Sequence, residues 1–234
     1  MRGALLPAVV LAAGCYEPAI PSGVRCSPRG ECPGDEACVA GICGGVEDVP
    51  EDPDGNTVIV GAKKSQLRDT EISGYDPDAI LGEDDHFSVD ELEVSLLWFE
   101  LPPLPAGREL VKATLRLRTA NDADEEGGSV RVFRMRESWD EGAATWFKRT
   151  PTQTWSAVGA APPSRDEMPI TVLRPDRTFT PFELALPVEL VRGWIADPAS
   201  NFGIAFVRGS SMQHVHIASR ESEQWSTLTL ELAP

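Results

Sequence analysis

The residues best suited to bind a ligand are cations on two strand-like stretches of the sequence. These stretches, 111–118 and 129–136, are joined by a short acidic segment, so we expect them to pair as a β-hairpin. Pairing would gather their outward-facing cations into one stripe. The stripe would consist of Lys112, Arg116, Arg118, Arg134 and Arg136. Because a guanidinium donates two parallel hydrogen bonds to a carboxylate, the stripe predicts binding of an acidic glycan, with a solvated strand face as the alternative.

Tryptophan side chains are the second group of candidate ligand contacts, because an indole offers a flat apolar face to a sugar ring. We predict that Trp98 and Trp155, and also Trp225, act as such platforms, with core packing as the alternative for each. The remaining tryptophans are expected in the core: Trp139, Trp146 and Trp194.

Histidine and acidic residues form weaker metal-binding patterns. His214 and His216 would lie on one face of a strand, but no carboxylate can be placed beside them, so we expect solvent-facing histidines. The acidic segment 121–127 begins like a calcium loop, yet Phe133 stands where the bidentate Glu is needed, which favours a hairpin tip. A structural calcium ion stays an open alternative for one acidic stretch. Its acids are Asp76, Asp78, Glu83, Asp84, Asp85 and Asp90.

The common catalytic motifs are missing from the sequence. It has no Gly-x-Ser-x-Gly elbow, no His-Glu-x-x-His and no phosphate-binding Gly loop, and no carboxylate stands out as half of an acid–base pair. We therefore expect a protein that is not an enzyme and has no catalytic residues, no cofactor and no catalytic metal. Acidic residues outnumber basic ones 37 to 21, and the net charge of −16 argues against nucleic acid as a partner.

Residues 1–14 indicate export. Arg2 supplies the positive start of a secretion signal, and 4–13 is an apolar run too short to span a bilayer. The ending Leu11-Ala12-Ala13-Gly14-Cys15 resembles the lipobox of bacterial lipoproteins, which implies acyl chains on Cys15 and a membrane anchor. Tyr16 after the cysteine points, by resemblance to sorting in Gram-negative bacteria, to the outer membrane. An ordinary signal peptide with a chance cysteine is the alternative.

Four further cysteines follow within eighteen residues: Cys26, Cys32, Cys38 and Cys43. In an exported chain this spacing predicts two disulfides that staple residues 15–43, a segment too small to have its own core. Zinc is the alternative, but the paired Cys-x-x-Cys units of strong zinc sites are missing. Resemblance to small secreted cysteine knots implies the pairs Cys26–Cys38 and Cys32–Cys43.

The rest of the chain divides into a linker and one domain. Residues 44–56 are acidic, rich in proline and poor in apolar side chains, which predicts a flexible linker. Residues 57–234 form the domain. With 20 Gly and 20 Pro, the chain favours turns over long helices.

Apolar patterning predicts the strands of this domain. Val111, Ala113, Leu115 and Leu117 should face the core, and 94–101 should be a central strand buried on both faces. Its two predicted faces are Leu97, Phe99 and Leu101 against Leu96 and Trp98. The apolar set in 129–136 changes sides, which suggests a β-bulge. Further strands are expected at 181–186, 203–208, 214–218 and 227–232.

One helix is predicted from Pro187 to Ile195, because proline opens it and Asp197-Pro198 ends it. We expect it to pack across one end of the domain. Short strands, Pro and Gly turns and the lack of a βαβ rhythm predict an all-β fold, an antiparallel two-sheet sandwich of jelly-roll type.

The stretch from Trp139 to Trp146 should form a packed corner where the chain leaves one sheet and enters another. Its acids, Asp140 and Glu141, have no base, metal or nucleophile assigned to them. We therefore expect Glu141 to cap backbone N–H groups or an indole N–H at the corner.

Several stretches together resemble the DNRLRE domain over about residues 67–232. They are, in order, Asp69-Thr-Glu-Ile72, Ser95-Leu-Leu-Trp-Phe-Glu-Leu101, Pro102-Pro-Leu-Pro-Ala-Gly107, Ala113-Thr-Leu-Arg-Leu117, Trp139-Asp-Glu with Thr145-Trp146, Asn201-Phe-Gly-Ile204 and Ser219-Arg-Glu221. That family overlaps a carbohydrate-binding module family whose members recognise alginate-like polysaccharide. The resemblance implies a surface lipoprotein whose sandwich binds acidic polysaccharide without cleaving it. A structural or adhesive module that binds an envelope protein through its cysteine-rich segment is the alternative.

Overall fold

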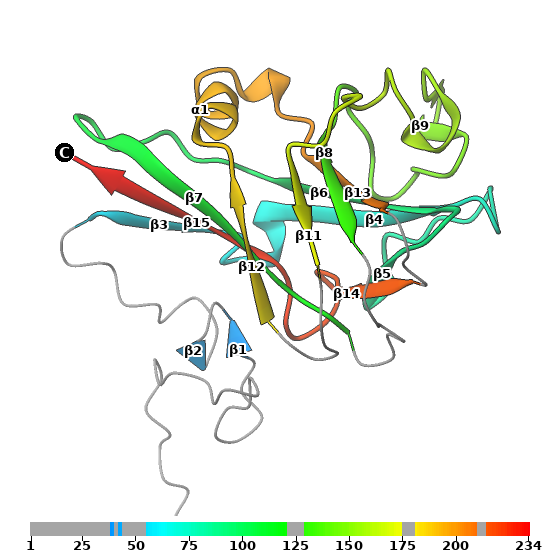
Figure 1. Ribbon diagram of the computed structural model, residues 1–234, viewed down its shortest axis with the longest axis horizontal. Helices are drawn as coiled ribbons and strands as arrows, with labels where there is room; N and C mark the ends of the chain where they lie inside the picture. The colour runs from blue at the N-terminus through cyan, green and yellow to red at the C-terminus, as the bar shows by residue number, and fades with distance from the viewer. Residues whose placement is uncertain (1–37, 40–41, 44–54, 121–128, 175–180, 210–213) are drawn as a thin grey trace, which may run out of the picture.

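The computed structural model describes residues 38–39, 42–43, 55–120, 129–174, 181–209 and 214–234 (Figure 1). The predicted signal peptide, Cys15, Cys26, Cys32, most of the linker and the acidic segment 121–127 lie outside the described residues. Strands β1 (Cys38–Val39) and β2 (Ile42–Cys43) form an antiparallel pair in which Cys38 lies opposite Cys43. Each predicted disulfide pair needs a cysteine outside the described residues. Both pairs therefore stay predictions.

Two antiparallel sheets form the body of the domain (Figure 1). The four-stranded sheet has the order β12 (Pro181–Leu186), β7 (Glu109–Arg118), β15 (Thr227–Ala233) and β3 (Thr57–Val60). The five-stranded sheet has the order β11 (Thr171–Leu173), β8 (Val130–Arg134), β13 (Ile204–Arg208), β6 (Glu93–Phe99) and β4 (Leu67–Ser73). The all-β prediction is confirmed.

Smaller elements complete the described part of the chain. Strands β5 (His86–Val89) and β14 (Val215–Ala218) pair antiparallel, as do β9 (Lys148–Thr150) and β10 (Gln153–Thr154). Three 3-10 turns lie at Lys64–Gln66 (η2), Val158–Ala160 (η3) and Pro198–Ser200 (η4). No helix among the described residues combines the length and apolarity that crossing a membrane requires.

One apolar core lies between the two main sheets. Leu115 and Leu117 of β7 share it with Leu97 of β6, Val132 of β8 and Phe206 of β13. These residues are almost fully buried, because alternate side chains of each strand point at the opposite sheet.

A second core covers the outer face of the five-stranded sheet, the face turned away from the four-stranded sheet. Ile72 and Leu96 of the five-stranded sheet pack on this outer face with Met135, Trp139 and Trp155 from the segment after β8. The prediction for β6 is therefore confirmed. Leu97 and Phe99 belong to the first core, with Leu101 packed against it, and Leu96 belongs to the second, with Trp98 packed against it.

The β-bulge predicted for residues 129–136 is not formed, and a bulge occurs in a different strand. β8 pairs with β13 without a register shift, and its adjacent apolar residues Val132 and Phe133 are both buried because each face of the strand is covered. The shift occurs instead where β7 pairs with β15, beside Val111. Val111 is therefore 50% exposed and does not face the core as predicted.

Helix α1 (Val188–Ala196) confirms the predicted helix, with Pro187 as its N-cap and Asp197 as its C-cap. Its buried face places Val191 and Trp194 in the first core.

The tryptophan corner lies where the chain leaves the five-stranded sheet, as predicted. After the corner the chain enters β9, which pairs with β10 in a separate two-stranded sheet, and it later returns as β11 beside β8. The corner also packs Trp139 on one face of the five-stranded sheet.

Candidate functional site

The predicted cationic stripe is not formed, because its two strands belong to different sheets. β7 lies between β12 and β15, whereas β8 lies between β11 and β13. β8 carries apolar residues on both faces and needs a sheet covered on both sides, while β7 buries only one face. The connection through 121–128 therefore leads from one sheet to the other.

The five cations of that prediction are distributed over three places. Lys112, Arg116 and Arg118 share the outer face of the four-stranded sheet, where Lys112 Nζ lies 2.6 Å from Glu231 Oε1. Arg134 is half-buried in β8. Arg136 follows β8 and forms an ion pair with Asp166.

The three tryptophans predicted as platforms all contact other parts of the protein. Trp155 is 5% exposed and donates from Nε1 to the carbonyl of Thr145 at 2.9 Å, so the prediction that it stacks on a ligand is wrong. Trp98 is half-buried under the guanidinium of Arg68, whose Cζ lies 3.9 Å from the ring centre. Trp225 donates to the carbonyl of Gly61 at 2.7 Å.

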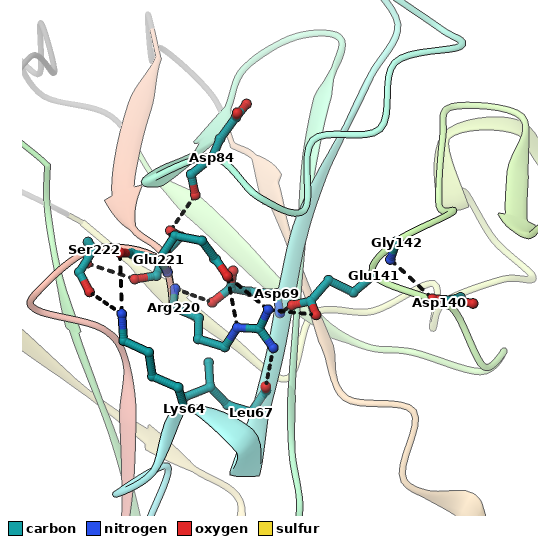
Figure 2. A network of polar contacts seen from close by, with 11 residues as sticks. Lys64, Leu67, Asp69, Asp84, Asp140, Glu141, Gly142, Arg220, Glu221 and Ser222 are labelled. Carbon is teal, nitrogen blue, oxygen red and sulfur yellow. Dashed lines mark hydrogen bonds and ion pairs between the residues drawn. The ribbon is translucent and has the colours of Figure 1, made fainter.

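The structure brings together a group that the sequence did not predict, which we call the Arg220 cluster: Asp69, Glu141, Arg220 and Glu221. Figure 2 shows the guanidinium of Arg220 between the acids. Its Nη2 lies 3.0 Å from Glu141 Oε2 and 2.9 Å from Glu221 Oε1, and its Nε donates to Glu221 Oε1 at 3.0 Å. The backbone N–H of Arg220 donates to Asp69 Oδ2 at 2.8 Å.

Three segments supply these residues. β4, an edge strand, carries Asp69, whose backbone N–H donates to Glu141 Oε1 at 2.9 Å. The tryptophan corner carries Glu141, held against a turn at Gly82, where an added Cβ would lie 2.5 Å from the Glu141 carbonyl oxygen. The prediction that Glu141 caps a backbone N–H is confirmed, although that N–H belongs to β4 and not to the corner.

A turn after β14 holds the third segment in place. Ser219 Oγ donates to the Asp84 carbonyl at 2.6 Å and accepts the N–H of Glu221 at 3.1 Å. Lys64 Nζ donates to the carbonyl of Ser222 at 3.1 Å, as Figure 2 shows. These contacts fix Arg220 between β4 and the corner.

Burial sets the electrostatics of the Arg220 cluster. It raises the pKa of Asp69 to about 8, against the hydrogen bond from the Arg220 backbone. Burial also raises the pKa of Glu141, opposed by the Asp69 N–H and the charge of Arg220. The guanidinium is occupied by protein acceptors, including the Leu67 carbonyl at 3.4 Å. The cluster therefore holds three segments of the chain together, and few of the guanidinium donors of Arg220 are left to bind a ligand carboxylate.

A second unpredicted group lies further along β4, which we call the histidine group: His86, His214, His216, Glu71 and Glu93. The ring centres of His86 and His216 lie 4.5 Å apart, and those of His214 and His216 4.9 Å apart. Glu71 is 7% exposed and accepts the backbone N–H of Ser88 at 2.7 Å. Burial, with the charge of Glu93, raises the pKa of Glu71 to about 7. The histidines are half-buried and not fully solvent-facing as predicted.

Among the described residues, no three His, Cys, Asp or Glu side chains are grouped to hold a metal ion. Within the acidic stretch predicted as an alternative calcium site, Asp85 instead contacts His86 Nδ1 at 2.8 Å, and Asp90 lies 3.5 Å from Arg208. The structural calcium ion stays an untested alternative.

Comparison with other proteins adds no family assignment: no family model matches the chain, and no curated protein matches it. Three stretches far apart in the sequence meet in the Arg220 cluster, through Asp69, Glu141 and Ser219-Arg220-Glu221. Their meeting gives those residues a shared structural role.

Proposed function

We propose that this chain is a lipid-anchored protein of the bacterial envelope whose jelly-roll sandwich binds an acidic polysaccharide without cleaving it. The observation that carries the proposal is the open outer face of the four-stranded sheet, which presents Lys112, Arg116 and Arg118 from one strand. The resemblance to the DNRLRE domain and the lipobox-like sequence before Cys15 support the same function and location.

The layout of this face suits an extended sugar chain. Its middle row consists of small side chains in register across three strands, Ala185, Thr114 and Thr229. Lys112 lies on one side of the row and Arg116 on the other, about 13 Å apart along β7 at the rise of a strand. A polymer crossing the strands over the small residues would have a cation on each side.

Charge on this face is only partly compensated. Lys112 is paired with Glu231, but among the described residues no carboxylate lies within ion-pair distance of Arg116. Arg118, two residues further along β7, places a second guanidinium on the same face. A carboxylate on every sugar would match these forked donors better than a neutral glycan.

Affinity electrophoresis of the full-length lipoprotein in detergent tests the proposal, with alginate or dextran cast in the gel. We expect alginate to retard the protein and dextran to leave it unaffected. The double variant that combines Arg116→Gln and Arg118→Gln should lose most of the retardation. Arg136→Gln is the matched control, because Arg136 lies on the other sheet and is paired with Asp166. The proposal is contradicted if alginate does not retard the parent protein. It is also contradicted if alginate retards the Arg116/Arg118 double variant as strongly as the Arg136→Gln control.

A further inference from the structure

Two arginines on the outer face of the five-stranded sheet flank one buried aromatic ring. The Cζ atoms of Arg131 and Arg165 lie 5.8 Å and 5.1 Å from the ring centre of Phe133. Arg131 precedes Phe133 by two residues in β8 and is exposed. Arg165 comes from the segment after the tryptophan corner, where its backbone forms an isolated antiparallel β-bridge with Met135. Two separate parts of the chain thus place guanidinium groups around the same ring.

Neutral acceptors hold both guanidinium groups in position. Arg165 Nη1 donates to the carbonyls of Ala160 at 2.6 Å and Gly159 at 3.3 Å. Arg131 donates from Nη2 at 3.0 Å and from Nε at 3.3 Å to the carbonyl of Arg208. These bonds orient the cations and leave their charges uncompensated.

The lack of a counter-ion separates these two residues from four other arginines of the protein. Arg136, Arg192, Arg208 and Arg220 each form an ion pair with a carboxylate. In the part of the chain that the structure describes, neither Arg131 nor Arg165 has a carboxylate within ion-pair distance. Burial, together with the positive charge of Arg131, lowers the pKa of Arg165 to about 10. The two cations therefore repel each other and have no acid beside them to offset the repulsion.

Apolar side chains border the exposed member of the pair. Val172 of β11 and Val207 of β13 are the register neighbours of Arg131 on either side, and Val172 is 39% exposed. A ligand that reaches Arg131 would therefore also touch apolar surface. This favours an anionic group carried on a carbon framework over a free inorganic ion.

We propose that Arg131 and Arg165 form a binding site for a carboxylate-bearing ligand, on the opposite sheet from the open face that carries the proposed polysaccharide function. A carboxylate would accept forked, charge-assisted hydrogen bonds from a guanidinium that is already oriented. It would also relieve the repulsion between the two cations. Because backbone carbonyls fix the donors in advance, little ordering of side chains opposes binding.

Titration of the full-length lipoprotein in detergent with glucuronate tests this site, because one sugar acid is too small to span the open face of the other sheet. The readout is the chemical shift of arginine Nε–Hε NMR signals, with glucose as the neutral control. We expect saturable shifts for Arg131 and Arg165 with glucuronate and none with glucose. Arg131→Gln should weaken binding at least tenfold.

Two further variants guard against a folding defect. Arg165→Lys keeps the charge but loses the fork, so we expect intermediate affinity. Arg149→Gln is the matched control, since Arg149 Nη1 is likewise held by neutral acceptors, the carbonyl and hydroxyl of Ser138. Glucuronate shifts that do not saturate, or an Arg131→Gln variant that is well folded and binds like the parent, overturns the site. Loss of alginate retardation in the Arg116 variants would leave it unaffected.

Discussion

Asp69 and Glu71 stand two residues apart on the same face of β4, and the protein accommodates these two buried acids in different ways. Asp69, 1% exposed, lies in the Arg220 cluster beside a cation that stays charged at any physiological pH. Glu71, 7% exposed, lies in the histidine group, where its neighbours are the Ser88 N–H, Glu93 and His86. One acid is therefore next to a permanent charge, and the other is next to groups that titrate.

The difference shows that a permanent cation does not by itself keep a buried acid ionised. The pKa of Asp69 rises to about 8 even beside Arg220, because burial outweighs the hydrogen bond from the Arg220 backbone and because Glu141 and Glu221 compete for the same guanidinium. Glu71 has one like-charged neighbour, Glu93, and its pKa rises to about 7. Burial is the largest cause at both sites, and the more deeply buried acid, Asp69, has the larger rise.

The largest effect is expected from removing the shared cation with Arg220→Met. The change leaves the half-buried acids Glu141 and Glu221 without their cation, which should cost a large part of the ~3–5 kcal/mol typical of breaking a fully buried ion pair. Urea unfolding at pH 7 measures the loss. Lys112→Met is the matched control, because its pair with Glu231 is exposed and solvent screens such a pair. Equal destabilisation by both changes would mean that the Arg220 cluster is no more than a surface ion pair.

The next effect concerns pH and uses Asp69→Asn, which keeps an oxygen to accept the Arg220 N–H. In the folded protein the pKa of Asp69 is about 8, whereas an unfolded aspartate titrates near 4. Between these pH values only the folded state holds the proton, so rising pH removes stability from the parent and not from the variant. We expect similar stability at pH 4 and a gain of a few kcal/mol for the variant at pH 9.

Urea midpoints across this pH range measure the gain. Asp197→Asn at the exposed end of α1 serves as the control and should leave the pH profile unchanged. A constant difference between Asp69→Asn and the parent at all pH values would show that the burial of Asp69 is not coupled to a proton.

Glu71→Gln sharpens the comparison with a smaller change. The amide oxygen can still accept the Ser88 N–H, and the sign is the same as for Asp69, because the folded pKa is raised. The window is narrower, since it runs from the unfolded value near 4.3 to about 7. We expect the stability gain to level off about one pH unit lower than for Asp69→Asn, and to reach a smaller final value. A gain that keeps growing to pH 9 would contradict this order of the two acids.

Sequence patterns predicted the strands better than their partners. The two apolar faces of β6 could be assigned because both sides of that strand are continuous in apolar residues. Val111 could not, because a bulge shifts the alternation by one position at a point where Leu110 and Val111 are equally apolar. The prediction that β7 pairs with β8 was wrong. A short connection can join two strands of one sheet or two strands of different sheets, so its length did not identify the partners.

The Arg220 cluster was harder to predict than the fold. Asp69 and Glu141 are 72 positions apart, and Asp69 and Arg220 are 151 apart, so no local period relates them. The signal available was the resemblance carried by Asp69-Thr-Glu-Ile72 and Ser219-Arg-Glu221, which marks the residues without saying that they meet. Trp155 gave no signal of its burial, since its neighbours in sequence show neither a strand nor a helix period.

The smallest effect separates the histidines by the acid that each one influences. Burial and the charge of Asp90 raise the pKa of Glu93, and His216 and His214 oppose that rise. Positive charge on these rings favours the ionised form of Glu93. The double variant that combines His214→Asn and His216→Asn should raise the pKa of Glu93 further. The rise should be less than about one pH unit, because half-exposed charges are screened. Carboxylate carbon NMR of labelled glutamate measures it. His86→Asn should instead raise the pKa of Glu71, which His86 lowers in the parent. If either variant moved both glutamates equally, the histidine group would act as one charge and not as separate partners of Glu71 and Glu93.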